Sequence, residues 1–232
     1  MTTNAIHDVI IIGGGAAGAS AAMVLGRARA DVLLLDAGAP SNAPSTGIGG
    51  LLGNDGISPE AFYSRVADEL AAYPSVHRRT GTATSITRPD ATAGSGRARW
   101  RVAIASPGTS AGDPLLDQAS EIHTVEADHV VLATGMHYDR PLIDGIEDKW
   151  GASVFHCPFC HGWEHRDQPM VVLGGHAHSA TGAQLLHRWS NDVTLVTNGM
   201  PPTADEQARL DALEVRTVPG TITAVAGPGR AL

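Results

Sequence analysis

The chain has 232 residues, of which 43% are hydrophobic and 17% charged, a composition typical of a folded domain rather than a disordered segment. Its net charge of −8 and single lysine argue against nucleic-acid binding, which requires clustered cations, so we interpret the basic stretch at residues 97–101 as a solvated hairpin edge. A signal peptide and the ~20 apolar residues needed to cross a bilayer are not recognisable, so we expect a cytoplasmic protein without membrane contact.

The first predicted unit is a buried strand over residues 8–12, a glycine-rich turn over residues 13–18 and a helix over residues 19–30. The turn satisfies G-x-G-x-x-G, in which the glycines allow a tight bend, close approach of a pyrophosphate, and packing of the helix on the strand. A second strand over residues 31–35 ends in an acid suited to bind a ribose. We therefore predict a dinucleotide site comprising Gly13, Gly14, Gly15, Ala16, Ala17, Gly18 and Asp36.

The middle of the chain departs from a plain nucleotide-binding pattern. Ser58, Pro59 and Glu60 supply an N-cap, a first-turn proline and an early acid, and they predict a helix to about residue 73. Strand-like pieces at residues 81–87, 100–105 and 121–125 are interpreted as an inserted β-meander. A further buried strand from residue 127 closes on the small residues Ala133, Thr134 and Gly135, a turn that lets backbone approach a cofactor.

The only two cysteines lie in FHCPFCHGWEHR, residues 155–166, with His161 directly after the second. The pattern is compatible with haem c attachment, with a zinc site that includes His165, and with a redox-active thiol pair. Haem c attachment usually follows export, and adjacent Cys160 and His161 would crowd a tetrahedral zinc site. We therefore favour a redox pair, without a metal, and keep zinc as the alternative. Pro158 indicates a helix that starts at Cys157.

A second glycine-rich turn follows a predicted strand at residues 170–173, before strands at residues 193–196 and 221–226. Its third glycine position holds His176 and its closing position holds Ser179. A side chain at residue 176 would obstruct a pyrophosphate, and the arginines that hold the 2′-phosphate of NADPH do not follow residue 196. We interpret this turn as a structural remnant, so that NAD(P)H is doubtful as a second cofactor.

This ordered set of motifs resembles the flavin-dependent pyridine-nucleotide disulfide oxidoreductases, and more closely the low-molecular-weight thioredoxin reductases. The resemblance implies an α/β fold of two Rossmann-like, three-layer units with an inserted β-meander. Residues 1–140 would form the FAD-binding domain and residues 141–232 an incomplete NAD(P)-binding-like domain that carries the cysteines. In this family a C-terminal segment completes the FAD domain, and this sequence does not include it. If that segment exists, the resemblance also implies a homodimer.

The resemblance further implies roles for particular residues. FAD would contact the first turn, Asp36 and the Ala133, Thr134, Gly135 turn. Cys160 would exchange electrons with the flavin and Cys157 would exchange with substrate. His161 stands where thioredoxin reductases usually carry an aspartate, and an imidazole suits the proton transfers of thiol–disulfide exchange.

The CPFCHG string and the missing arginines resemble the gliotoxin- and holomycin-type dithiol oxidases. The leading hypothesis is therefore an FAD-dependent oxidoreductase acting on a sulfur group, which oxidises a small-molecule dithiol to a disulfide with oxygen as acceptor. One alternative is an NAD(P)H-dependent, thioredoxin reductase-like enzyme whose partner is a thioredoxin-like protein. The other is a non-catalytic flavin- or nucleotide-binding remnant.

Overall fold

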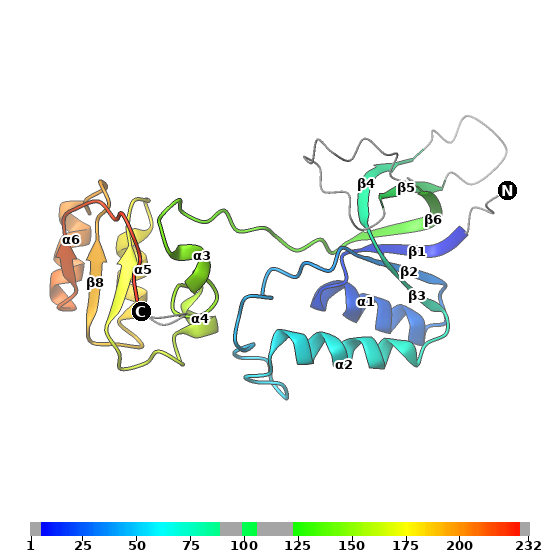
Figure 1. Cartoon of the computed structure of the whole chain (residues 1–232), viewed down its shortest axis with the longest axis horizontal. Helices are drawn as coiled ribbons and strands as arrows, with labels where there is room; N and C mark the ends of the chain where they lie inside the picture. Colours follow the sequence, from blue (N-terminus) through cyan, green and yellow to red (C-terminus); the bar gives the residue numbers. More distant parts are fainter. Residues whose placement is uncertain (1–5, 89–98, 106–122, 228–232) are drawn as a thin grey trace. The chain divides into compact units, whose positions relative to one another are not determined.

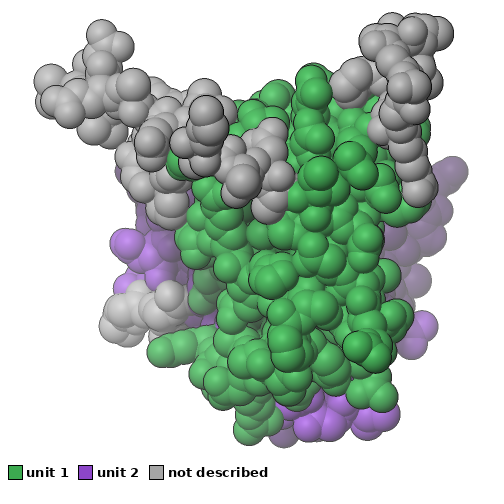
Figure 2. Space-filling view, turned by 90° about the vertical axis from the view of Figure 1, so that its right-hand side faces the viewer, with its two compact units in different colours: residues 1–43, 60–138 green, residues 44–59, 139–232 purple. Residues whose placement is uncertain are grey.

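The computed structural model describes residues 6–88, 99–105 and 123–227. The chain divides into two compact units, coloured separately in Figure 2. The first comprises Met1–Ala43 and Glu60–Tyr138, and the second comprises Pro44–Pro59 and Asp139–Leu232. The predicted domain boundary at residue 140 lies beside the passage from Tyr138 to Asp139. The segment Pro44–Pro59, which no sequence motif singled out, groups with the second unit.

The first unit contains a six-stranded sheet in the order β3-β2-β1-β6-β5-β4 (Figure 1). Strand β1 pairs in parallel with β2 and β6, and β2 pairs in parallel with β3. Strands β4 and β5 continue the sheet beyond β6 in antiparallel pairing. The strand bounds are Ile6–Ile12 for β1, Val32–Asp36 for β2, Val76–Thr80 for β3, Thr82–Thr87 for β4, Trp100–Ala105 for β5 and His123–Leu132 for β6.

Strand β6 corrects the prediction of two separate strands in this region. It is one continuous strand whose first half pairs with β5 and whose second half pairs with β1. The acids in its middle have partners: Glu126 pairs with Arg101 at 2.8 Å and Asp128 with Arg99 at 3.4 Å. The basic stretch was predicted to be a solvated hairpin edge, but β5 lies between β4 and β6 in the sheet, and Arg99 and Arg101 are paired with acids of β6. Residues 97–98 and 121–122 of the predicted elements lie outside the described residues.

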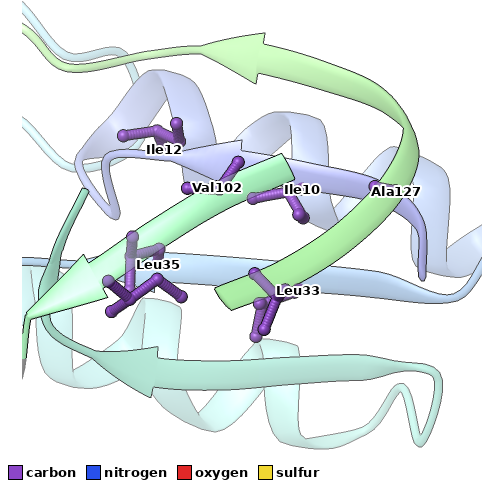
Figure 3. Close-up of a cluster of buried hydrophobic side chains, with 8 residues drawn as sticks. Ile10, Ile12, Leu33, Leu35, Val102 and Ala127 are labelled. Atoms are coloured by element: carbon purple, nitrogen blue, oxygen red, sulfur yellow. The ribbon is translucent and has the colours of Figure 1, made fainter. Parts of the chain in front are cut away.

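Strands β1 and β2 are buried on both faces over most of their length, which explains their uninterrupted apolar sequences. Helices α1 (Ala16–Arg27) and α2 (Pro59–Ala71) cover one face, where the buried residues are Val9, Ile11, Ala19, Ala22, Val32, Leu34 and Leu70. Residues from β5 and β6 pack against the other face (Figure 3), in a cluster of Ile10, Ile12, Leu33, Leu35, Val102, Ile104, Val125 and Ala127. The meander is therefore the third layer of this unit.

The second unit is built on a parallel sheet of three strands, β7 (Met170–Leu173), β8 (Val193–Val196) and β9 (Arg216–Val218). The unit also contains the helices α5 (Ser179–Leu186) and α6 (Ala204–Ala212), and the short helices α3 (Ile146–Lys149) and α4 (Pro158–His161), which precede β7 in the chain. Its core consists of Met170, Ala180, Ala183, Leu186, Val193, Leu195, Leu210 and Val215.

The end of the second unit differs from the prediction. The strand expected at residues 221–226 forms only an isolated bridge between Ala224 and Asp144, whereas β9 was not predicted. A strand of three residues that ends a sheet carries too little hydrophobic alternation to be recognised in sequence. Within the described residues, the helices lack the combination of length and hydropathy that a bilayer-spanning helix requires.

Candidate functional site

The first glycine-rich turn is held by two backbone contacts that exclude side chains. Gly13 has a φ of 110°, and a Cβ on this residue would lie 2.1 Å from the carbonyl oxygen of Ala133. A Cβ on Gly18 would lie 1.8 Å from the carbonyl oxygen of Gly13. The bend and the close packing of α1 therefore require glycine at both positions. The same contacts bring the predicted turn at Ala133 and Thr134 against the first turn.

Gly15 has a different environment from its neighbours. It is the N-cap of α1, with φ −65° and ψ −177°, and no side chain caps the helix there. A Cβ on this residue would meet nothing within 4 Å. The helix N-terminus thus faces open space, which a side chain at residue 15 would fill. Uncapped amides and the dipole of a helix N-terminus attract phosphate, so this cradle fits the pyrophosphate of a dinucleotide.

Asp36 lies beside the turn, as predicted. A Cβ on Gly14 would lie 2.5 Å from Asp36 Oδ2, and Asp36 Oδ1 accepts a hydrogen bond from the amide of Gly38 at 2.9 Å. The carboxylate is therefore anchored through one oxygen beside the turn. Gly135, exposed with a φ of 68°, ends the turn of Ala133, Thr134 and Gly135 that follows β6.

Tyr63 is a site residue that sequence reasoning missed. Its hydroxyl donates to Asn42 Oδ1 at 3.2 Å. Burial raises the pKa of Tyr63, and the nearby Asp36 carboxylate also raises it. The hydrogen bond to Asn42 lowers this pKa but does not cancel the effect of burial. The backbone of Ala16 also interacts with this hydroxyl. Since Tyr63 comes from α2 and matches no motif, only the packing of α2 reveals its place near the turn.

The two cysteines lie together at helix α4 in the second unit. Cys157 is the N-cap, and Pro158 occupies the first turn as predicted. The two Sγ atoms are 2.7 Å apart, so the pair is placed to alternate between dithiol and disulfide. Although Cys160 is exposed as a residue, partial burial of its thiol and the neighbouring Cys157 raise the pKa of Cys160 to about 11. In the dithiol form, Cys160 therefore carries its proton at neutral pH.

His161 ends α4 with a restrained imidazole. Its Nε2 lies 3.3 Å from Ser45 Oγ, which itself donates to the carbonyl of Gly47 at 2.5 Å. The ring stacks on Phe155 at a centroid distance of 5.2 Å, and the ring of His165 stacks on the same Phe155 at 5.5 Å. Burial lowers the pKa of His161, an effect that the carbonyl of Cys157 opposes. The imidazole is thus neutral at neutral pH and able to accept a proton.

The segment Pro44–Pro59 is a second part of the site that sequence reasoning missed. Besides the contact of Ser45 with His161, a Cβ on Gly49 would lie 2.8 Å from the carbonyl oxygen of Cys160. The segment therefore packs directly on α4. The small residues of STGIGG at residues 45–50 were the available signal, because a stretch of small residues allows close backbone approach.

The zinc alternative is not supported by the arrangement of its four candidate ligands. Among the described residues, the ligand atoms of Cys157, Cys160, His161 and His165 do not gather at metal-binding distances, whereas a different group in the first unit does. Two of the ring nitrogens have other partners: His161 Nε2 contacts Ser45, and His165 Nε2 lies 3.2 Å from the carbonyl oxygen of Ala152.

The second glycine-rich turn keeps the bend of a nucleotide-binding turn, but its backbone amides donate hydrogen bonds to side chains of the turn itself. Gly174 and Gly175 approach the backbone and side chains after β8 closely. The amide of His176 donates to Ser179 Oγ at 3.2 Å, and the amide of His178 donates to Nδ1 of His176 at 3.2 Å. Amides engaged in this way are not free for a pyrophosphate.

A pocket of about 260 Å³ opens beside this second turn. Its lining includes Glu206, which is the acid of the capping box at the start of α6. The hydrogen bonds from Thr203 lower the pKa of Glu206. Among the described residues that line the pocket there is no lysine or arginine. A lining that includes this carboxylate and lacks lysine and arginine disfavours the 2′-phosphate of NADPH.

The chain combines an α/β unit that carries a dinucleotide-type turn with a second unit that carries a C-x-x-C pair, the combination that the resemblance to the flavin-dependent disulfide oxidoreductases implies. The chain belongs to the pyridine nucleotide-disulphide oxidoreductase family, whose model matches residues 7–214. This finding confirms the resemblance inferred from the motifs.

Similar proteins agree with this assignment. A probable thioredoxin reductase of Arthroderma benhamiae is 32% identical over 193 residues, which cover 83% of this chain and 44% of that protein. Thioredoxin reductase sirT of Leptosphaeria maculans is 33% identical over 172 residues, 74% of this chain and 47% of that protein. The crystal structure of HlmI matches with a TM-score of 0.82 and 34% identity over 96% of this chain and 64% of that chain. The predicted fold class is thereby confirmed, and the chain spans less than half the length of these two curated relatives.

Proposed function

We propose that this protein is an FAD-dependent oxidoreductase that oxidises a small-molecule dithiol to a disulfide, with oxygen as the final electron acceptor. The observation that carries the proposal is the second glycine-rich turn, where the amides of His176 and His178 are engaged internally and the described residues that line the pocket include no lysine or arginine. An enzyme with a thiol pair but no site for a nicotinamide cofactor needs another electron partner. Oxygen meets this need for a flavoprotein.

The first glycine-rich turn is the proposed cofactor site. The open space at Gly15 would hold the pyrophosphate of FAD, and Asp36 would accept hydrogen bonds from the ribose. Ala133, Thr134 and Gly135 line the adjoining turn. FAD bound there supplies a two-electron acceptor for the thiol pair and returns the electrons to oxygen.

The chemistry assigned to the chain itself is thiol–disulfide exchange. A thiolate of the substrate attacks Cys157 in the Cys157–Cys160 disulfide, forms a mixed disulfide and releases the sulfur of Cys160. The second substrate thiol then attacks the mixed disulfide, so that the substrate leaves as a disulfide and both cysteines are reduced. The released Cys160 takes a proton readily, since its thiol pKa is about 11.

His161 is the proposed proton carrier of this exchange. It follows Cys160 directly, and burial lowers its pKa so that it is an uncharged base at neutral pH. In this form it accepts the proton of a substrate thiol, and the thiolate is the attacking species. The Ser45 hydroxyl at 3.3 Å orients the ring.

The family match favours a second candidate, an NAD(P)H-dependent disulfide reductase whose partner is a thioredoxin-like protein. The relatives named thioredoxin reductase support this alternative, whereas the occupied amides of the second turn oppose it. A non-catalytic remnant is the third possibility.

One experiment separates the three. The purified chain is loaded with FAD and mixed anaerobically with dithiothreitol or, separately, with NADPH, while the visible flavin absorbance is followed. We expect bleaching by the dithiol, recovery in air, and no rapid bleaching by NADPH. Rapid bleaching by NADPH alone supports the reductase. Failure to gain FAD supports a non-catalytic remnant.

A further inference from the structure

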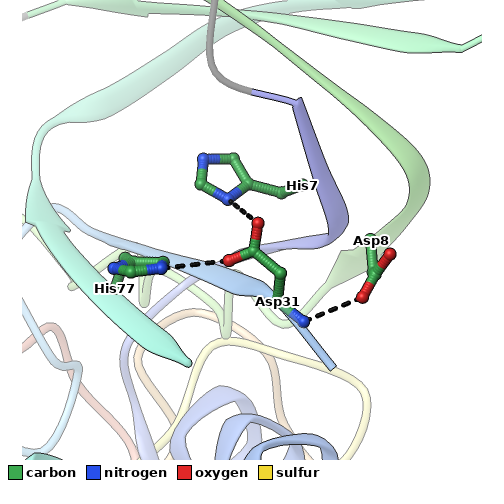
Figure 4. A network of polar contacts seen from close by, with 4 residues as sticks. All are labelled: His7, Asp8, Asp31 and His77. Atoms are coloured by element: carbon green, nitrogen blue, oxygen red, sulfur yellow. Dashed lines mark hydrogen bonds and ion pairs between the residues drawn. The ribbon is translucent and has the colours of Figure 1, made fainter. Parts of the chain in front are cut away.

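A cluster of two histidines and one aspartate lies in the first unit, at the strand ends opposite the glycine-rich turn. His7 lies near the start of β1, Asp31 directly precedes β2, and His77 lies on β3. Figure 4 shows both imidazoles directed at the same carboxylate. His7 Nδ1 is 3.1 Å from Asp31 Oδ2, and His77 Nε2 is 3.0 Å from Asp31 Oδ1. The thiol chemistry makes no use of these residues.

The backbone holds Asp31 firmly in this position. Its amide donates to Asp8 Oδ2 at 2.9 Å, and its carbonyl accepts from the amides of Asp8 and Val9 at 3.0 and 3.2 Å. His7 is only 9% exposed, and each residue of the cluster lies on or beside a strand of one parallel sheet. Because strands fix side chains more closely than loops do, the three groups are preorganised.

One oxygen of the Asp31 carboxylate is available to bind a further group. Asp31 Oδ1 is shielded from solvent and accepts no hydrogen bond from the described residues, although the imidazole of His77 is near. A buried acceptor without a donor is costly. A cation between the three side chains would remove this cost.

The distances fit a transition-metal site. One ligand atom from each residue lies within 4.8 Å of the other two. Zinc binds imidazole nitrogen and carboxylate oxygen at about 2.0–2.2 Å, which places the ligands of a tetrahedral site roughly 3.3–3.6 Å apart. The two nitrogen–oxygen distances, 3.1 Å from His7 to Asp31 Oδ2 and 3.0 Å from His77 to Asp31 Oδ1, involve different oxygens of the carboxylate and are close to this range. The remaining adjustment falls on the side chain of His77, which is 53% exposed and free to shift.

We propose that His7, Asp31 and His77 bind Zn²⁺ or a similar divalent transition metal, through two imidazole nitrogens and the carboxylate of Asp31. Water completes the coordination on the exposed side. Such an ion would join the starts of three strands, so that its binding stabilises the folded first unit. The same polar contacts without an ion would be a hydrogen-bonded network, and the two cases respond differently to added metal.

The test is calorimetric titration of Zn²⁺ into chelator-treated protein. The parent variant carries Cys157→Ser and Cys160→Ser, so that thiolates do not contribute. We expect one Zn²⁺ per chain, and at least tenfold weaker binding after His77→Ala or Asp31→Asn. The matched control is His129→Ala, which removes an exposed histidine of the same sheet and should leave the affinity unchanged.

A thermal melt in the absence of metal accompanies each titration, and both substitutions lie at partly exposed side chains, so we expect folded variants. Zn²⁺ should raise the melting temperature of the parent but not of the His77→Ala variant. No Zn²⁺ binding by the parent, or equal affinity in His77→Ala, Asp31→Asn and His129→Ala, would overturn the proposal and leave a hydrogen-bonded network only.

Discussion

Replacement of Gly15 by alanine separates the binding role of the first glycine-rich turn from its folding role. At this position the backbone angles are accessible to any residue, and a Cβ would contact nothing within 4 Å. The lower entropy of the unfolded chain favours alanine by about 0.4–1 kcal/mol, whereas the N-cap position favours glycine over alanine. We therefore expect the stability of Gly15→Ala to stay within about 1 kcal/mol of the original.

The effect on FAD binding should be much larger. The new methyl group occupies the space through which a pyrophosphate reaches the amides at the start of α1. Loss of one hydrogen bond to a charged group costs about 1.5–3 kcal/mol, which corresponds to roughly ten- to hundredfold weaker binding. The assay is a titration of apoprotein with FAD, followed by flavin fluorescence, alongside urea unfolding of the apoprotein.

The matched control is Gly18→Ala, in which the same methyl group would lie 1.8 Å from the carbonyl oxygen of Gly13. Overpacking of this kind typically costs about 1–3 kcal/mol or more, so this variant should lose stability before any ligand is added. The reasoning is refuted if Gly15→Ala binds FAD as tightly as the original chain, or if its apoprotein is as unstable as Gly18→Ala.

Three further predictions concern the thiol site. Cys157→Ser should abolish turnover of a dithiol. The Cys157 thiolate of the Cys160→Ser variant, mixed with a small-molecule disulfide, should attack it, release one thiolate and retain the other half as a mixed disulfide, which mass spectrometry detects; no trapped adduct would contradict the assigned roles. Ser45→Ala removes the contact to His161 and should slow dithiol oxidation several-fold, because a lost hydrogen bond costs about 0.5–1.5 kcal/mol; rates at several pH values check this, and an unchanged pH profile would argue against an orienting role. Burial lowers the pKa of His161 from 6.5, so the folded protein binds fewer protons than the unfolded chain and stability falls as the pH drops through about 6.5. Denaturant unfolding of His161→Gln should show a smaller acid loss than the control His178→Gln, and equal losses would contradict the sign.

Much of the fold could be predicted because its signals are local. The run of apolar residues in β1 and β2 indicates strands buried on both faces, and the helix from Pro59 follows from Ser58, Pro59 and Glu60 as neighbours in sequence. The long strand β6 was divided in the prediction, because Glu126 and Asp128 interrupt its apolar pattern and their partners Arg101 and Arg99 are distant in sequence. Strand β9 was missed because three residues show no readable period.

The residues of the candidate site also fall into two groups, those predicted from the local sequence and those revealed by the tertiary structure. The sequence by itself determined the glycine-rich turn, the thiol pair and the altered second turn, since each depends on residues within a few positions of one another and on backbone conformations that only certain residues adopt. Tertiary structure decided which distant residues join them. Ser45 meets His161 across 116 positions, and His7, Asp31 and His77 meet only because three strands run parallel. Contacts of this kind arise from chain topology and packing, which leave no local pattern in the sequence.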